Sequence, residues 1–213
     1  MRHILIYFKI LKKAQRLGLK VPKNYEDILN GYSNIKKTGN DKIIFTWFFG
    51  GNIPTLDANA TLKGKILFNA EWAARVVLFD NEETLNAFKS TVGHELTHKD
   101  REITIERCYS SLDKLFIRRI NEVRADFGAG QRMLNSQRNL VLDAVNYKRA
   151  LNSRGRRLKF DPHPTWEQRY NYIKNYNFNK ELIYKIADDM NYHNETIIEM
   201  VCEYYEDINL ERA

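Results

Sequence analysis

The chain has 213 residues, a net charge of +7 and an ordinary globular composition, with 43% hydrophobic and 29% charged residues. A chain of this length can bury a substantial core, and the composition excludes an intrinsically disordered protein. It contains no run of 18 uninterrupted apolar residues and only two cysteines. We therefore expect no membrane-spanning helix, no disulfide framework, and a cytoplasmic location.

Residues 1–40 are predicted to form an N-terminal basic amphipathic helical segment. The first 23 residues include seven lysines and arginines and no acidic residue, and Ile4, Phe8 and Leu11 share one helical face. Two interpretations remain. The helix could pack on the body of the protein with a solvated lysine face, or it could make a peripheral contact with an anionic membrane surface.

The pattern changes to short strands between residues 40 and 80. Stretches rich in β-branched and aromatic residues predict strands over 42–49, 64–68 and 75–79, and Gly50-Gly51 marks a turn after the first of them. Either of the last two could be the edge strand to which an extended substrate adds. Together with the helical patterns that follow, these segments predict an α+β fold with a small sheet.

The next segment contains H-E-L-T-H at residues 94–98, at the end of an apolar stripe with helical spacing. In a helix, residues i and i+4 lie on the same face, so His94 and His98 can bind one metal ion. Glu95 then stands beside the metal, where it can take a proton from a water molecule. The alternative is a solvated helix face that carries two histidines by chance.

A second amphipathic helix is predicted over residues 106–134, with a buried face formed by Leu112, Leu115, Phe116, Val123, Phe127 and Leu134. Glu122 and Asp126 flank this face, and buried carboxylates need partners because an unpaired buried charge is costly. Glu122 is the candidate third metal ligand, and Asp126 could accept the second N–H of a ligand histidine. Alternatively, both could pair on the helix surface with Arg118, Arg119 or Arg124.

The remaining residues carry two opposed clusters of charge. A basic cluster over residues 149–159 is interpreted as a solvated loop, and no nucleic-acid partner is expected because no recognised nucleic-acid motif accompanies it. Residues 176–213 are predicted to form an acidic C-terminal helical segment. The opposite charges suggest the hypothesis that the acidic tail from Asp188 onward covers a positively charged cleft and keeps the protein latent.

Three runs together resemble a known pattern. They are H-E-L-T-H at 94–98, N-E-V-R-A-D at 121–126 and D-P-H-P-T-W-E-Q-R at 161–169. In this order they are similar to the gluzincin pattern H-E-x-x-H, E-x-x-A-D and H-P-x-x-x-x-R of the M48 peptidases of the HtpX type and of the soluble minigluzincins. The spacing of 24 residues from His98 to Glu122 is short for the M48 peptidases and nearer that of thermolysin-like or ImmA-type peptidases.

This resemblance implies a zincin-like catalytic core over residues 41–175. It also implies one zinc ion per chain held by His94, His98 and Glu122, with His163 and Arg169 near the metal. Arg169 would be available to Asp126, to Glu122 or to the substrate.

The implied activity is that of a zinc-dependent endopeptidase acting on a protein or peptide substrate. Glu95 would be the general base, and His163, between Pro162 and Pro164, would stabilise the oxyanion of the tetrahedral intermediate. Otherwise His163 is an idle loop histidine. Two alternative functions stand beside this one: an ImmA-like regulatory protease specific for one partner protein, and a non-catalytic zinc-stabilised binding module.

Overall fold

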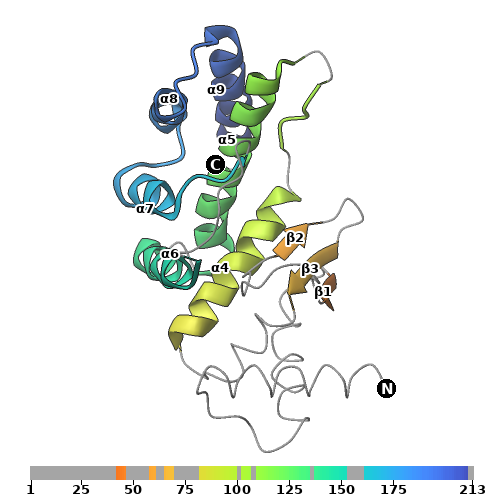
Figure 1. The fold of residues 1–213 in the computed structure, drawn as a ribbon, viewed down its shortest axis with the longest axis vertical. Helices are drawn as coiled ribbons and strands as arrows, with labels where there is room; N and C mark the ends of the chain where they lie inside the picture. The colour runs from red at the N-terminus through yellow and green to blue at the C-terminus, as the bar shows by residue number, and fades with distance from the viewer. Residues whose placement is uncertain are drawn as a thin grey trace, which may run out of the picture.

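The computed structural model describes residues 42–46, 58–60, 65–69, 82–99, 102–106, 109–134, 137–152 and 161–210 (Figure 1). Six helices make up most of this part: α4 (Glu82–His98), α5 (Ser111–Met133), α6 (Arg138–Asn152), α7 (Trp166–Asn175), α8 (Lys180–Asp189) and α9 (Glu195–Leu210). The predicted N-terminal segment, the predicted strand over 75–79 and most of the basic cluster lie outside the described residues.

Three short strands are assigned ahead of the helices: β1 (Lys42–Thr46), β2 (Ala58–Ala60) and β3 (Lys65–Asn69). β3 lies between the other two, parallel to β1 and antiparallel to β2.

The α+β fold class that the sequence predicts is wrong: apart from these three short strands, the described residues form six helices and the loops that join them. The physical reason is that the described core residues all lie on helices or on the loops that join them. Their apolar residues recur with helical spacing, so the helices bury these stripes mainly against one another, and α4 also contacts β2 and β3.

The start of α5 is determined by a cap. Ser110 precedes the helix, and its hydroxyl accepts a hydrogen bond from the backbone N–H of Asp113, while the Asp113 carboxylate accepts one from the backbone N–H of Ser110. This reciprocal pair satisfies two backbone donors that the first helical turn leaves free. The helix therefore begins at Ser111 and not near residue 106 as predicted. Leu112, predicted to be buried, is 62% exposed in this first turn.

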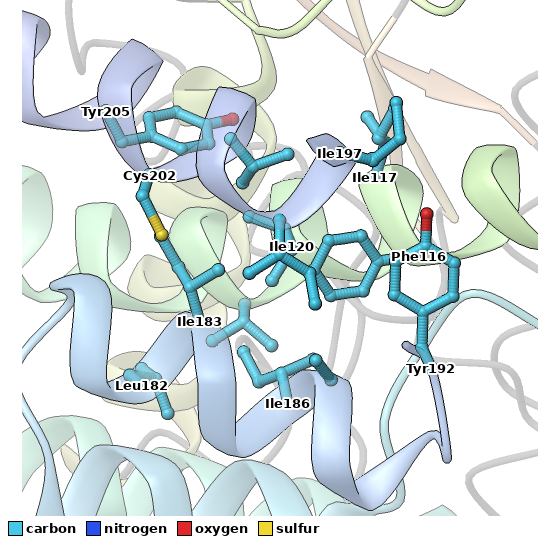
Figure 2. Close-up of a cluster of buried hydrophobic side chains, with 14 of the residues drawn as sticks. Phe116, Ile117, Ile120, Leu182, Ile183, Ile186, Tyr192, Ile197, Cys202 and Tyr205 are labelled. Carbon is cyan, nitrogen blue, oxygen red and sulfur yellow. The ribbon is translucent and has the colours of Figure 1, made fainter. Parts of the chain in front are cut away.

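The larger core cluster joins α5 to α8 and α9 (Figure 2). Phe116 and Ile120 of α5 face Ile183 and Ile186 of α8 across it, and the Phe116 ring stacks on Tyr192 with the centroids 4.4 Å apart. α9 contributes Ile197, Ile198, Val201, Cys202 and Tyr205. The C-terminal segment is therefore a structural layer that buries one end of α5.

The other half of α5 supports the site. A smaller apolar cluster of Leu134, Val141, Val145 and Ile173 connects the end of α5 to α6 and α7. α4 packs between α5 and α6 (Figure 1). α4 and α5 approach closely at Gly128, where a Cβ atom would lie 2.3 Å from Thr97 Oγ1. This contact brings the histidine face of α4 against Glu122. None of the described helices is both long and apolar enough to cross a membrane.

Candidate metal centre

Three potential ligand atoms converge between α4 and α5. The Nε2 atoms of His94 and His98 are 3.0 Å apart. Glu122 Oε2 lies 3.2 Å from the first of them and 3.6 Å from the second. These three side chains form the one group among the described residues that could hold a metal ion, with ligand atoms within 4.8 Å of one another. The i, i+4 spacing on α4 and the packing of α5 against it produce this convergence.

The other ring nitrogen of each of these histidines faces a carboxylate. His94 Nδ1 lies 2.9 Å from Asp126 Oδ1, and His98 Nδ1 lies 2.5 Å from Glu102 Oε1. An ionised carboxylate can only accept a hydrogen bond, so each Nδ1 must donate. In the neutral imidazole, the lone pair is then on Nε2 and points to the shared centre.

The donor set fits a zinc ion. Glu122 Oε2 is buried and has no hydrogen-bond partner among the described residues. When both rings are neutral, two imidazole lone pairs and one carboxylate oxygen meet with no donor hydrogen between them, an arrangement that favours a shared cation, either a metal ion or a proton. Two histidines and one glutamate, each histidine oriented by a carboxylate, are the ligands that open zinc sites use.

Asp126 connects this centre to α7. Besides accepting from His94, its carboxylate accepts hydrogen bonds from Arg169, one of them from Nε at 2.7 Å and another from the guanidinium terminus. Burial alone would raise the pKa of Asp126, but the charges of Arg169 and His94 outweigh it and lower the pKa well below its usual range. Arg169 also stacks over the Trp166 ring, with its Cζ 4.3 Å from the centroid.

Glu95 lies on the buried part of α4, 8% exposed, and makes no hydrogen bond to any residue that the structure describes. The nearby cations belong to Arg169 and Lys148. Lys148, on α6, is buried, and its Nζ donates to Ser90 Oγ at 3.3 Å, one turn before His94. Burial, followed by repulsion from Arg169, lowers the pKa of Lys148 to about 7.

His163 lies next to Glu122. Its Nε2 is 3.3 Å from Glu122 Oε2, and its side chain is 51% exposed. Its Nδ1 is 2.6 Å from Asp161 Oδ1, so this ring is paired with a carboxylate in the same way as His94 and His98. The loop before α7 therefore places the imidazole at the open side of the centre. His163 is not part of the group whose ligand atoms lie within 4.8 Å of one another.

The structure thus brings together the seven candidate site residues predicted from the sequence, which contact one another or are neighbours on α4. They are His94, Glu95, His98, Glu122, Asp126, His163 and Arg169. The structure also adds four that the analysis did not place in these roles: Glu102, Asp161, Lys148 and Arg119. Two of them had a local signal, because Glu102 stands four residues after His98 and Asp161 two before His163. Lys148 and Arg119 form hydrogen bonds with residues that are 42 to 58 positions away in the sequence. No local sequence pattern predicts contacts over such a separation.

Comparisons of the chain with protein families, with curated proteins and with solved structures found no match.

Proposed function

We propose that this chain is a zinc-dependent endopeptidase of the gluzincin type that hydrolyses peptide bonds in a protein or peptide substrate. The observation that carries the proposal is the convergence of His94 Nε2, His98 Nε2 and the buried Glu122 Oε2, which has no hydrogen-bond partner among the described residues; Glu95 follows His94 on the same helix. Zinc at this position would polarise a peptide carbonyl and make water a stronger nucleophile at neutral pH.

The chain's own residues supply the proton transfers. A carboxylate that makes no hydrogen bond to the described residues, such as that of Glu95, can accept a proton from water. It can then pass this proton to the leaving amine. His163 can donate from Nε2 to a developing oxyanion when that nitrogen carries a proton, and the contact of Nδ1 with Asp161 orients the ring for this role.

A zinc site that only stabilises a fold is normally closed by four protein ligands. Here three ligand atoms converge among the described residues, the half-exposed His163 lies 3.3 Å from Glu122 Oε2, and Glu95 follows His94 directly on α4. A glutamate carboxylate beside a group of only three candidate ligands among the described residues favours hydrolysis over a purely stabilising role. A regulatory protease specific for one partner would use the same centre, so the same experiments test its chemistry.

The first experiment measures the zinc content of the purified protein. We expect about one zinc ion per chain, and its loss in His94→Ala, His98→Ala and Glu122→Ala. The matched control is His193→Ala, because His193 is exposed and contacts Asn191 outside this centre. Stoichiometric zinc in Glu122→Ala would remove Glu122 from the ligand set.

The second part of the experiment separates binding from chemistry in Glu95→Gln. The amide has the shape of the carboxylate but cannot act as a base. Zinc should be retained, while turnover of casein or of a peptide library should fall by roughly a hundredfold or more. Undiminished hydrolysis by this variant would overturn the proposed mechanism.

A further inference from the structure

We infer that Arg119 is a positioning residue for the proposed reaction, because it fixes the loop that holds His163 against Glu122. The inference rests on the proposed function. It concerns a residue three positions before Glu122 on α5, far from the histidine in sequence.

The contacts of Arg119 are made with the backbone of that loop. Its Nε donates to the carbonyl of Pro162 at 3.2 Å, and its Nη2 donates to the carbonyl of Asp161 at 3.2 Å. The guanidinium is therefore bonded to the two consecutive carbonyls that precede His163. Arg119 itself is buried, with 9% of its surface exposed.

The loop is also held at its other end and from within. Thr165 caps α7 by accepting from the backbone N–H of Gln168 at 2.9 Å, and its own N–H donates to the Gln168 side chain at 3.0 Å. Asp161 Oδ1 accepts from both the backbone N–H and the ring Nδ1 of His163. Arg119 is thus the clamp that connects this compact loop to the helix carrying the ligand.

Position 119 suits this task because residues three apart share one face of a helix. Glu122 and the guanidinium of Arg119 are thereby part of one rigid element, and the distance from Glu122 Oε2 to His163 Nε2 depends on both. A lysine could not replace the arginine, because a single ammonium lacks the planar fork that reaches two acceptors in fixed directions. A displacement of about 1 Å in a catalytic group can cost roughly a hundredfold in rate.

The test compares Arg119→Met, Arg119→Lys and the control Arg118→Met, whose arginine is exposed on the same turn of α5. In Arg119→Met we expect full zinc content, a nearly unchanged KM and a turnover number lower by roughly tenfold to a hundredfold. Arg119→Lys should restore only part of the turnover, and Arg118→Met should match the wild type.

A double-mutant cycle distinguishes positioning from a general effect on the fold. In the His163→Ala background, Arg119→Met should cause less than about a twofold further loss, because the group that it positions is already gone. Multiplicative losses in the double mutant would overturn the inference, as would zinc loss in Arg119→Met or wild-type turnover in that variant. Should Arg119→Met fail to fold, Arg119→Lys is taken through the same cycle.

A measurement that needs no catalysis separates this inference from the proposed function. The ¹⁵N shifts of the His163 ring report whether Nδ1 carries the proton held by Asp161. We expect a fixed Nδ1–H in the wild type and averaged shifts in Arg119→Met, with unchanged His94 signals. Identical His163 shifts in both proteins would overturn the inference even in an active enzyme. An inactive wild type with the expected shifts would refute the peptidase alone.

Discussion

The pairing of imidazole with carboxylate is repeated three times at this centre, by His94 with Asp126, His98 with Glu102 and His163 with Asp161. Each pair orients its ring and directs the Nε2 atom at Glu122. Burial lowers the pKa of His94 and of His98, but the carboxylates around them outweigh burial and raise both pKa values. The metal must therefore compete with protons for the same nitrogens.

The pH dependence of zinc binding follows from this competition. In the metal-free protein, burial lowers the pKa of His98, but the carboxylates of Glu102 and Glu122 outweigh it and raise the pKa from 6.5 to about 10. Because zinc binds only the deprotonated ring, each binding event releases this proton at neutral pH. The dissociation constant for zinc should fall about tenfold or more per pH unit between pH 7 and pH 9.

The raised pKa of His98 also affects the stability of the metal-free protein. This stability should decrease as the pH rises, whereas zinc affinity should increase. A group whose pKa is raised on folding stabilises the folded state below its unfolded pKa, here 6.5, and this contribution disappears as the pH rises toward 10. Zinc titrations against a competing chelator measure how the dissociation constant for zinc changes with pH, and Glu102→Gln should reduce the slope of that dependence. A zinc affinity that does not change between pH 7 and pH 9 would contradict this account.

Local spacing explains which site residues the sequence could predict. His94 and His98 are four apart, as are Glu122 and Asp126, and each pair lies beside an apolar stripe that indicates the buried face. Arg119 and Lys148 were not predicted because their partners are the backbone of a distant loop and the hydroxyl of Ser90 on another helix. Their roles exist only after the helices have packed.

At the scale of elements, the spacing between α4 and α5 sets the size of the metal centre. The two helices are closest where Gly128 meets Thr97, and the Thr97 hydroxyl is itself tied to the carbonyl of Gly93 at 2.8 Å. With hydrogen in place of a side chain, the helices can approach closely enough for Glu122 to reach both histidines. The glycine therefore contributes to the site although it has no functional group.

Gly128→Ala should widen this interface. Alanine is the better helix former by about 1 kcal/mol, so any loss must come from the contact with Thr97. We expect a lower free energy of unfolding, by about 1–3 kcal/mol as for other overpacked positions, and weaker zinc binding, by roughly tenfold. Chemical denaturation and a zinc titration measure the two effects.

Gly130→Ala is the matched control for this substitution. Its Cβ atom would lie 2.9 Å from Val141 Cγ2, at the interface with α6. A methyl group at the end of a side chain can move aside, and α6 contributes no ligand. Zinc affinity should therefore stay at the wild-type value. Equal zinc loss in both variants would show that the approach at Gly128 has no special role.

The strands predicted over 42–49 and 64–68 are present as β1 and β3, but the α+β fold class inferred from them is wrong for a definable reason. Short runs of β-branched and aromatic residues over 42–49 and 64–68 predict strands wherever they occur, but they do not indicate how large a sheet results or whether it builds the core. The assigned strands have five, three and five residues. The long helical stripes after residue 82 determine the architecture of the part that carries the site.

At the scale of the whole molecule, α5 divides its length between two tasks. One end is buried by α8 and α9, and the other carries Glu122 and Asp126 toward α4. Near the boundary, Asn121 accepts a hydrogen bond from the hydroxyl of Tyr205 at 2.6 Å, and Arg124 lies over the same ring, 5.3 Å from its centroid. α9 thus supports α5, the helix that carries Glu122. This structural role differs from that of a removable segment that covers a cleft.

This arrangement predicts opposite outcomes for two neighbouring substitutions on α9. Ile198 is 1% exposed in the main core, whereas Glu203 is exposed. Ile198→Ala leaves a cavity and should lower the free energy of unfolding by about 2–5 kcal/mol. It should weaken zinc retention on heating, because the fold that assembles the ligands is less stable. Glu203→Gln removes an acidic charge without touching the core, so stability and peptide hydrolysis should both remain at wild-type values.

If the acidic segment instead kept the enzyme latent through its charge, Glu203→Gln, alone or with Glu206→Gln, would raise hydrolysis of casein at constant zinc content. Thermal unfolding and initial rates, measured on the same preparations, decide between a structural layer and an inhibitory cover.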